Sequence, residues 1–137
     1  MLRAYSTLGE HGALWMALGC GGAVLDRRRR DRWRRATLTV IAAQVTSTSI
    51  KLVIGRRRPL VDELPALIAT PTGLSFPSSH ASGSFAAARA FAPLVGSRTI
   101  YLPATAMALS RVLLGVHYPS DVIAGAALGA VIGSFGR

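Results

Sequence analysis

Basic, histidine and aspartate side chains lie in three short clusters of a largely apolar sequence. The clusters comprise Lys51 and Arg58 in KLVIGRRRP, Ser78, Ser79 and His80 in FPSSH, and Arg111, His117 and Asp121 in SRVLLGVHYPSD. Burying such groups among apolar residues is costly unless they interact with one another or with a ligand. We therefore expect the three clusters to meet in one site.

The fixed cations Lys51, Arg58 and Arg111 suit a dianionic, tetrahedral oxyanion, because arginine offers a planar fork and lysine a compact charge. Ser78 and Ser79 open an apolar run, and the start of a helix presents free backbone N–H groups that bind anions. Either hydroxyl could also cap the helix or donate to a phosphate oxygen.

Two histidines and one aspartate complete the set. A neutral His117 could act as a nucleophile, and Asp121 could fix its tautomer if the chain turns at Pro119. His80 could protonate the leaving group as a general acid. This inventory predicts cleavage of a phosphomonoester or pyrophosphate through a phosphohistidine. It requires no metal ion or cofactor, because the site has a single carboxylate and no paired Cys/His spacing.

The elements that must position these residues are five apolar segments, which we expect to be helices because a backbone in lipid must satisfy its own hydrogen bonds. They cover residues 12–25, 36–54, 79–96, 99–116 and 120–135. The expected fold is therefore an all-α, polytopic membrane bundle of about five transmembrane helices, forming one domain over residues 1–137. Gly125, Gly129 and Gly133 share one helix face, which could pack inside the bundle or form a homo-oligomer.

The stretch DRRRRDRWRR at 26–35 contains seven arginines in ten residues and lies between two apolar segments. The positive-inside rule places it in a cytoplasmic loop near anionic head groups. The three clusters then lie on the external face. With the arginine stretch inside, the N-terminus is external unless the first segment, which is short for a span, is re-entrant.

The chain has 137 residues, of which 50% are hydrophobic, and a formal net charge of +10. A basic protein usually has an anionic partner, and the long apolar runs favour membrane lipids over nucleic acid. The single cysteine, Cys20, excludes an internal disulfide.

The ordered motifs Lys-x6-Arg-Pro, Pro-Ser-x-His and Ser-Arg-x5-His-x3-Asp resemble those of the type-2 phosphatidic acid phosphatase family, or lipid phosphate phosphatases. This family shares its core with vanadium haloperoxidases and bacterial acid phosphatases. The motifs cover residues 51–121 of this sequence. The resemblance implies a metal-independent enzyme built as a helical bundle, with its site at the external end.

The resemblance also implies roles for individual residues. His117 would be the nucleophile, Asp121 its orienting partner and His80 the acid that protonates the departing lipid. Phosphate would be held by Lys51, Arg58, Ser78, Ser79 through its backbone N–H, and Arg111. The sequence departs from the family in having Ser79 where glycine is usual, and in showing five apolar segments where six spans are usual.

We therefore expect a lipid phosphatase in the bacterial plasma membrane that acts on the external or periplasmic face. Its candidate substrates are polyprenyl phosphates or pyrophosphates, a decaprenyl-phosphoryl pentose phosphate, phosphatidic acid and phosphatidylglycerol phosphate. The alternatives are a lipid phosphotransferase of the same fold and a non-catalytic binder of anionic lipid. Arg56 and Arg57 could contact lipid or substrate or be solvated, and Arg89 is expected to point to the cytoplasmic side or pair inside the bundle.

Overall fold

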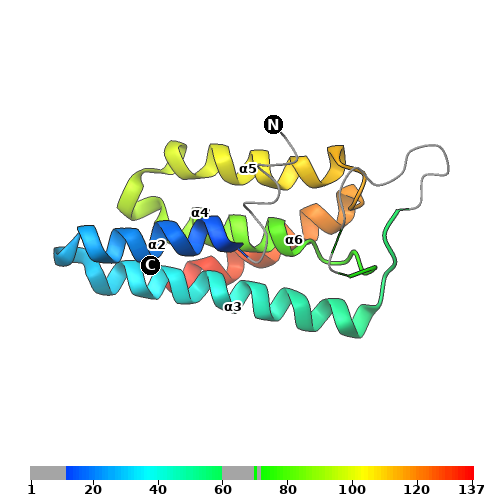
Figure 1. Cartoon of the computed structure of the whole chain (residues 1–137), viewed down its shortest axis with the longest axis horizontal. Helices are drawn as coiled ribbons and strands as arrows, with labels where there is room; N and C mark the ends of the chain where they lie inside the picture. Colours follow the sequence, from blue (N-terminus) through cyan, green and yellow to red (C-terminus); the bar gives the residue numbers. More distant parts are fainter. Residues whose placement is uncertain (1–11, 60–69, 71) are drawn as a thin grey trace.

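The computed structural model describes residues 12–59, 70 and 72–137, and within these ranges it contains five α-helices (Figure 1). Their order along the chain is α2 (Ala13–Leu25), α3 (Arg30–Ile54), α4 (Ser79–Val95), α5 (Ser97–Leu113) and α6 (Pro119–Gly133). The predicted all-α architecture is confirmed for these residues, and each helix overlaps one of the expected apolar segments. Residues 1–11, which include the predicted N-terminal end of the topology, lie outside the described part.

Helix α3 begins six residues earlier than the expected segment at 36–54, so part of the arginine stretch is helical rather than loop. The carboxylate of Asp26 accepts the backbone N–H of Arg29 at 3.2 Å and starts a short 3-10 turn over Arg27–Arg29. Arginine is a good helix former, so the helix continues from Arg30 without interruption. The connection between α2 and α3 is therefore only a few residues long.

Helix α4 lies at the centre of the bundle and contacts each of the other four helices. Small side chains allow this, and its buried residues include Ala81, Gly83, Ala87 and Ala90. At one end of the bundle the ring of Phe91 packs 5.5 Å from that of Trp33 in α3. Nearby, the indole N–H of Trp15 in α2 donates to the hydroxyl of Ser84 at 3.0 Å.

The predicted glycine face of α6 packs against α4. A Cβ atom at Gly125 would lie 2.5 Å from the Ser78 carbonyl oxygen, and one at Gly129 would lie 2.1 Å from that of Ser82. The next turn repeats the pattern at Gly133. Only glycine permits such close backbone approach. This face is thus occupied within the monomer and is not free for the oligomer that the sequence left open.

The bundle exposes many apolar side chains on its surface and buries several hydroxyl groups beside an apolar core. Large apolar side chains are exposed on several helices, whereas many hydroxyl groups are buried. The exposed set includes Leu25, Leu38, Val45, Val53, Leu102, Leu109, Leu113, Ile123 and Val131, and the fully buried set includes Ser47, Ser75, Ser78, Ser82, Ser84 and Ser110. Exposed apolar surface of this extent fits a lipid environment.

The expectation of about five transmembrane helices needs correction. Among the described residues, two helical stretches are long and apolar enough to cross a membrane, Arg27–Ile54 and Pro119–Gly136. Helices α4 and α5 have 17 residues each, about 26 Å, and α2 has 13, about 20 Å, against a hydrocarbon core of about 30 Å. These three helices are therefore shorter than the two spanning-length stretches and shorter than the hydrocarbon core.

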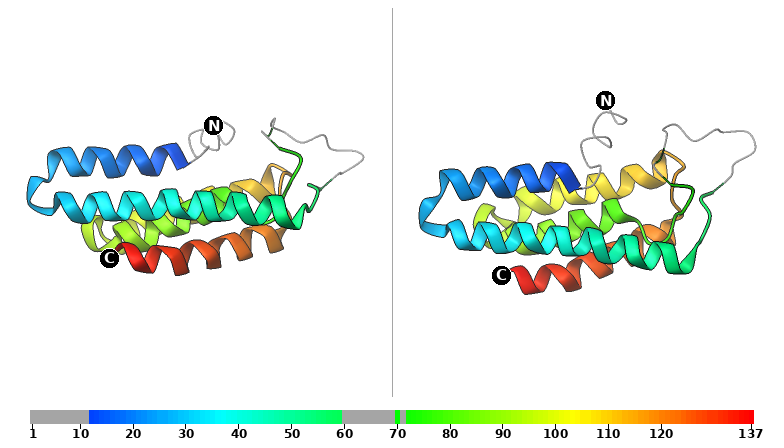
Figure 2. Two further views of the ribbon diagram at one scale, coloured as in Figure 1. Left: turned by 90° about the horizontal axis from the view of Figure 1, so that it is seen from below. Right: turned by 60° about the horizontal axis from the view of Figure 1, so that its bottom comes forward.

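The helices run so that all three sequence clusters meet at one end of the bundle. This end holds the C-terminus of α3, the start of α4, the end of α5 and the start of α6 (Figure 2). The opposite end holds the arginine-rich turn between α2 and α3, the α4–α5 connection and the C-terminus. Helix α2 does not extend to the site end, because its first residues lie beside Gln44, about 15 Å short of Ile54 along α3.

Candidate active site

The segment after α3 is fixed by its pairing with residues 72–75. Helix α3 ends at Gly55, which has φ of 65° and donates its N–H to the Lys51 carbonyl at 3.0 Å. Beyond it, the Ser75 N–H donates to the Arg56 carbonyl at 2.7 Å, and the Arg58 N–H donates to the Gly73 carbonyl at 3.1 Å. Arg56 and Arg58 therefore project from a fixed backbone.

The first turn of α4 is attached to the first turn of α6. The Ser78 N–H donates to the Asp121 carbonyl at 3.0 Å, and the Ser78 hydroxyl caps α4 by accepting the Ala81 N–H at 3.4 Å. Ser79 differs from the usual glycine, and its hydroxyl pairs with that of Ser47 in α3 at 3.0 Å. The Ser79 side chain is thus directed to α3, which leaves its backbone N–H in the unpaired first turn of the helix.

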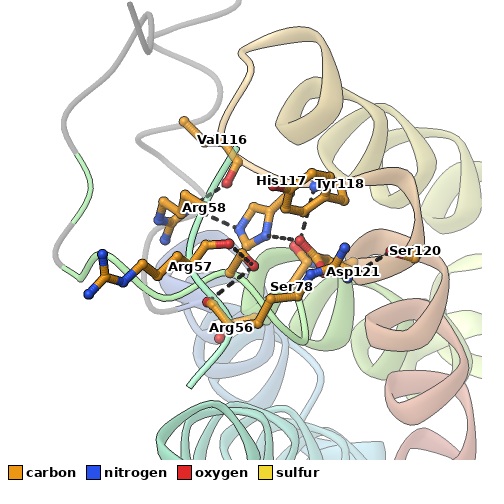
Figure 3. Close-up of polar contacts among 12 residues, drawn as sticks. Arg56, Arg57, Arg58, Ser78, Val116, His117, Tyr118, Ser120 and Asp121 are labelled. Carbon is orange, nitrogen blue, oxygen red and sulfur yellow. Dashed lines mark hydrogen bonds and ion pairs between the residues drawn. The ribbon is translucent and has the colours of Figure 1, made fainter. Parts of the chain in front are cut away.

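His117 lies in the turn between α5 and α6 and is almost completely buried, at 3% exposure. Its Nε2 is 3.2 Å from Nη1 of Arg58, and its Nδ1 is 3.5 Å from Oδ2 of Asp121 (Figure 3). Burial, and to a lesser extent the nearby charges of Arg58, Lys51, Arg111 and His80, together lower the pKa of His117 to about 2. The imidazole is therefore neutral at physiological pH, as a nucleophile must be.

Arg58, which the sequence predicts to bind phosphate, is held beside His117 by two backbone carbonyls. Its Nε donates to the Thr72 carbonyl at 2.9 Å, and its Nη1 donates to the Val116 carbonyl at 2.7 Å. Burial lowers the pKa of Arg58, with partial compensation by Asp121. The guanidinium still remains charged, because arginine does not deprotonate in proteins.

Lys51 and Arg111 are brought to the same place from α3 and α5. Both side chains are buried, with exposures of 7% and 3%. Their charges act on His117, and so does His80 at the start of α4. The structure thus brings together all eight predicted site residues at one end of the bundle: Lys51, Arg58, Ser78, Ser79, His80, Arg111, His117 and Asp121.

One further residue of the site was set aside on sequence grounds. Nη1 of Arg56 donates to Oδ1 of Asp121 at 2.8 Å and to the Ser120 hydroxyl at 2.9 Å. The signal that could have identified it is charge balance, since Asp121 is the only carboxylate in its part of the sequence and is buried. Arg57, in contrast, has an exposed side chain directed away from Asp121 (Figure 3).

Arg89 lies far from this site, as expected. It is half-buried, and its side chain lines a shallow depression with Tyr101 and Ser134. Its carbonyl accepts from Arg137 at 3.5 Å, at the end of the bundle opposite to His117. In the described part of the chain, no three His, Cys, Asp or Glu side chains are grouped so that they could hold a metal ion.

The geometry describes a helical bundle with a histidine at one end, surrounded by buried cations. Residues 32–136 match the model of the PAP2 superfamily. The chain belongs to this superfamily.

Named relatives and solved structures agree with this assignment. The chain is 41% identical over 132 residues to decaprenylphosphoryl-5-phosphoribose phosphatase of Mycobacterium tuberculosis (strain ATCC 25618 / H37Rv), covering 96% of this chain and 75% of that protein. It is 34% identical over 112 residues to lipid A 4'-phosphatase of Bacteroides thetaiotaomicron, covering 74% of this chain and 48% of that protein.

Two crystal structures share the fold. LpxE of Aquifex aeolicus superposes with a TM-score of 0.81 at 23% identity, covering 98% of this chain and 82% of that one. The transmembrane PAP2-type phosphatidylglycerolphosphate phosphatase of Bacillus subtilis gives a TM-score of 0.76 at 22% identity, covering 96% and 71%.

Proposed function

We propose that this chain is a lipid phosphatase that hydrolyses a membrane lipid phosphate through a phosphohistidine at His117. The observation that carries the proposal is the position of His117. Its Nε2 faces Arg58 at 3.2 Å, while its Nδ1 faces the carboxylate of Asp121 at 3.5 Å. One nitrogen is thus directed to a phosphate-binding cation, and the other to an acceptor that selects the Nδ1–H tautomer.

In the first step, the Nε2 lone pair of His117 attacks phosphorus, and the bond from phosphorus to the lipid oxygen breaks. His80 gives its proton to that departing oxygen. Lys51, Arg58 and Arg111 stabilise the charge on the three equatorial oxygens. The backbone N–H of Ser79 and the hydroxyl of Ser78 add hydrogen bonds at the start of α4.

In the second step, water attacks the phosphorus of phosphohistidine, and His80 takes the proton that the water loses. The bond between phosphorus and Nε2 breaks, inorganic phosphate leaves, and His117 returns to its neutral form. Each atom and proton is then accounted for, with no other reactant than water.

The substrate that we favour is a polyprenyl-linked phosphate of the cell envelope. The relative at 41% identity is named as a phosphatase of decaprenylphosphoryl-5-phosphoribose, and the alignment with it covers nearly this whole chain. Phosphatidic acid and phosphatidylglycerol phosphate are the competing lipid substrates.

The bundle is proposed to lie in the bacterial plasma membrane, with the site on the external face. The exposed apolar side chains of α2, α3, α5 and α6 support embedding, because they would otherwise face water. The arginine-rich turn at the opposite end supports the orientation, since cytoplasmic loops carry an excess of arginine.

The test is phosphate release from a panel of decaprenylphosphoryl-5-phosphoribose, decaprenyl phosphate, phosphatidic acid and phosphatidylglycerol phosphate. We expect wild type to release phosphate from at least one of them and His117→Ala to release none. Undiminished release by the variant would refute the role of His117. No release by wild type from any of the four would favour an anionic-lipid binder, and transfer to an added acceptor lipid in place of water would identify a phosphotransferase.

A further inference from the structure

Arg56 occupies a place beside the proposed nucleophile that the sequence motifs do not assign. Its guanidinium contacts three groups of the α6 start: Oδ1 of Asp121 at 2.8 Å, the Ser120 hydroxyl at 2.9 Å, and the ring of Tyr118, whose centroid lies 4.1 Å from Cζ. Arg56 thus bridges the segment after α3 to the residues that follow His117 (Figure 3).

These contacts determine how the Asp121 carboxylate is oriented. Oδ2 accepts the Tyr118 N–H at 2.9 Å, and Oδ1 accepts from Arg56. With both oxygens bound, the carboxylate cannot rotate, and Oδ2 is held 3.5 Å from Nδ1 of His117. The Asp121 side chain is completely buried, so its charge needs a partner in the same place.

Arg56 is itself held from three sides. Its carbonyl accepts the N–H of Ser75 at 2.7 Å, and the Ser75 hydroxyl at 3.3 Å. Its guanidinium stacks on Tyr118, which disfavours other rotamers. Arg58 contacts His117 at 3.2 Å, whereas Arg56 contacts Asp121 at 2.8 Å, so the two arginines have different tasks.

We infer that Arg56 is a positioning residue: it fixes the Asp121 carboxylate and offsets its negative charge, so that Asp121 orients His117 as a neutral imidazole and does not convert it to an imidazolium. The inference rests on the proposed function of His117 as nucleophile. An unbalanced carboxylate beside a buried imidazole would draw a proton onto it, and a protonated histidine cannot attack phosphorus.

Among the other charged groups around His117, Lys51 and Arg58 also interact electrostatically with Asp121. Lys51 comes from α3, Arg58 from the following segment, His80 from α4 and Arg111 from α5, and all of them act on His117. Among the contacts of the described residues, however, the ion pair with Asp121 at hydrogen-bond distance is made by Arg56.

The test compares Arg56→Gln, Arg56→Lys and the matched control Arg57→Gln, which removes the same charge from the adjacent, exposed side chain. Wild type and His117→Ala are run beside them on decaprenyl phosphate and phosphatidic acid in mixed micelles. We expect Arg56→Gln to lower kcat about tenfold or more with KM nearly unchanged, and to move the acidic limb of kcat/KM upward by about one pH unit. Arg56→Lys should return the acidic limb of the kcat/KM profile to its wild-type pH. Arg57→Gln should have the kcat and the pH profile of wild type.

A double-mutant cycle separates positioning from general destabilisation. In an Asp121→Asn background, Arg56→Gln should have little further effect on kcat, because the group it positions is already altered. Additive losses, or a raised KM with unchanged kcat, would overturn the inference. The same holds for equal effects of Arg56→Gln and Arg57→Gln.

A measurement without substrate keeps the inference independent of the proposed reaction. In ¹⁵N-histidine NMR spectra of the micelle-bound protein at pH 6, wild type and Arg57→Gln should show a neutral His117 protonated at Nδ1. Arg56→Gln should show a mixture of the two neutral tautomers, because the Asp121 carboxylate is no longer held in one orientation. An unchanged His117 signal would refute the positioning role, while a wild type that hydrolyses none of the four lipids of the panel would refute the proposed function instead.

Discussion

Oδ2 of Asp121 lies 3.5 Å from Nδ1 of His117, one helical turn earlier in the sequence, and the same oxygen accepts the Tyr118 N–H at 2.9 Å. The carboxylate therefore caps α6 and faces the imidazole at the same time. Because the backbone hydrogen bond is the shorter contact, the cap fixes the carboxylate in the place from which it can orient His117.

Replacing Asp121 by asparagine should separate these two tasks. Asparagine can still accept the Tyr118 N–H, so we expect the variant to fold with a thermal midpoint close to wild type. Its kcat should fall by about 10² to 10⁴, because an amide no longer favours the Nδ1–H tautomer or stabilises charge on the ring. Phosphate release in micelles measures the loss of kcat, and thermal unfolding in micelles measures the midpoint. A variant that loses stability but retains kcat would show that Asp121 is only a cap.

Stability should fall as the pH is lowered below about 6.5. Burial and nearby cations lower the pKa of His117 from 6.5 to about 2 in the folded protein. The unfolded chain then binds more protons than the folded one between these values, so the free energy of unfolding decreases as the pH falls through this window. We expect the thermal midpoint to drop between pH 7.5 and pH 5, and to drop less in His117→Gln. Equal slopes for the two proteins would contradict a buried, neutral histidine.

The contact between α4 and α6 should be sensitive to a single methyl group. A Cβ atom at Gly129 would lie 2.1 Å from the Ser82 carbonyl oxygen, whereas nothing lies within 4 Å of one at Gly21 in α2. Gly129→Ala should destabilise the protein by about 1–3 kcal/mol or more, because backbone must move. Gly21→Ala should be neutral or stabilise by up to about 1 kcal/mol through helix propensity. Thermal unfolding of the two variants gives the comparison, and equal midpoints would argue against this packing.

Two cysteines at opposite ends of the bundle test the orientation. Thr72 lies at the site end and Arg28 in the arginine-rich turn, and both are exposed. In a Cys20→Ser background, Thr72→Cys should react with a membrane-impermeant maleimide added to intact cells. Arg28→Cys should react only after permeabilisation. The reverse pattern would place the site on the cytoplasmic face.

The helices and the clusters could be predicted because their signals are local. Apolar runs mark α4, α5 and α6 to within a few residues, and Gly125, Gly129 and Gly133 predict the face that meets α4. The cations and histidines could be assigned to one site, because few reactions other than phosphoryl transfer require these side chains together. The sequence prediction for the start of α3 is wrong by six residues. A run of arginines is typical of a cytoplasmic loop, but arginine also favours helix, and here the helix begins at Arg30.

Contacts between distant residues were not accessible from the sequence. Arg56 and Asp121 are separated by 65 positions, and three adjacent arginines give no local sign of which one forms the pair. The Ser47–Ser79 hydrogen bond is similar, since it depends on how closely α3 approaches α4. Such pairs are set by helix packing, so the candidate site could be predicted as a set of residues but not as a network.

The central claim is that phosphorus is transferred to Nε2 of His117, and rapid-quench trapping tests it most directly. The enzyme would be mixed with ³²P-labelled decaprenyl phosphate or phosphatidic acid, denatured in alkali within milliseconds, and analysed for protein-bound label. We expect a protein-bound label that survives alkali, is lost in acid and is located on His117. We expect no bound label in His117→Asn. Hydrolysis without a labelled intermediate, or label on another residue, would contradict it.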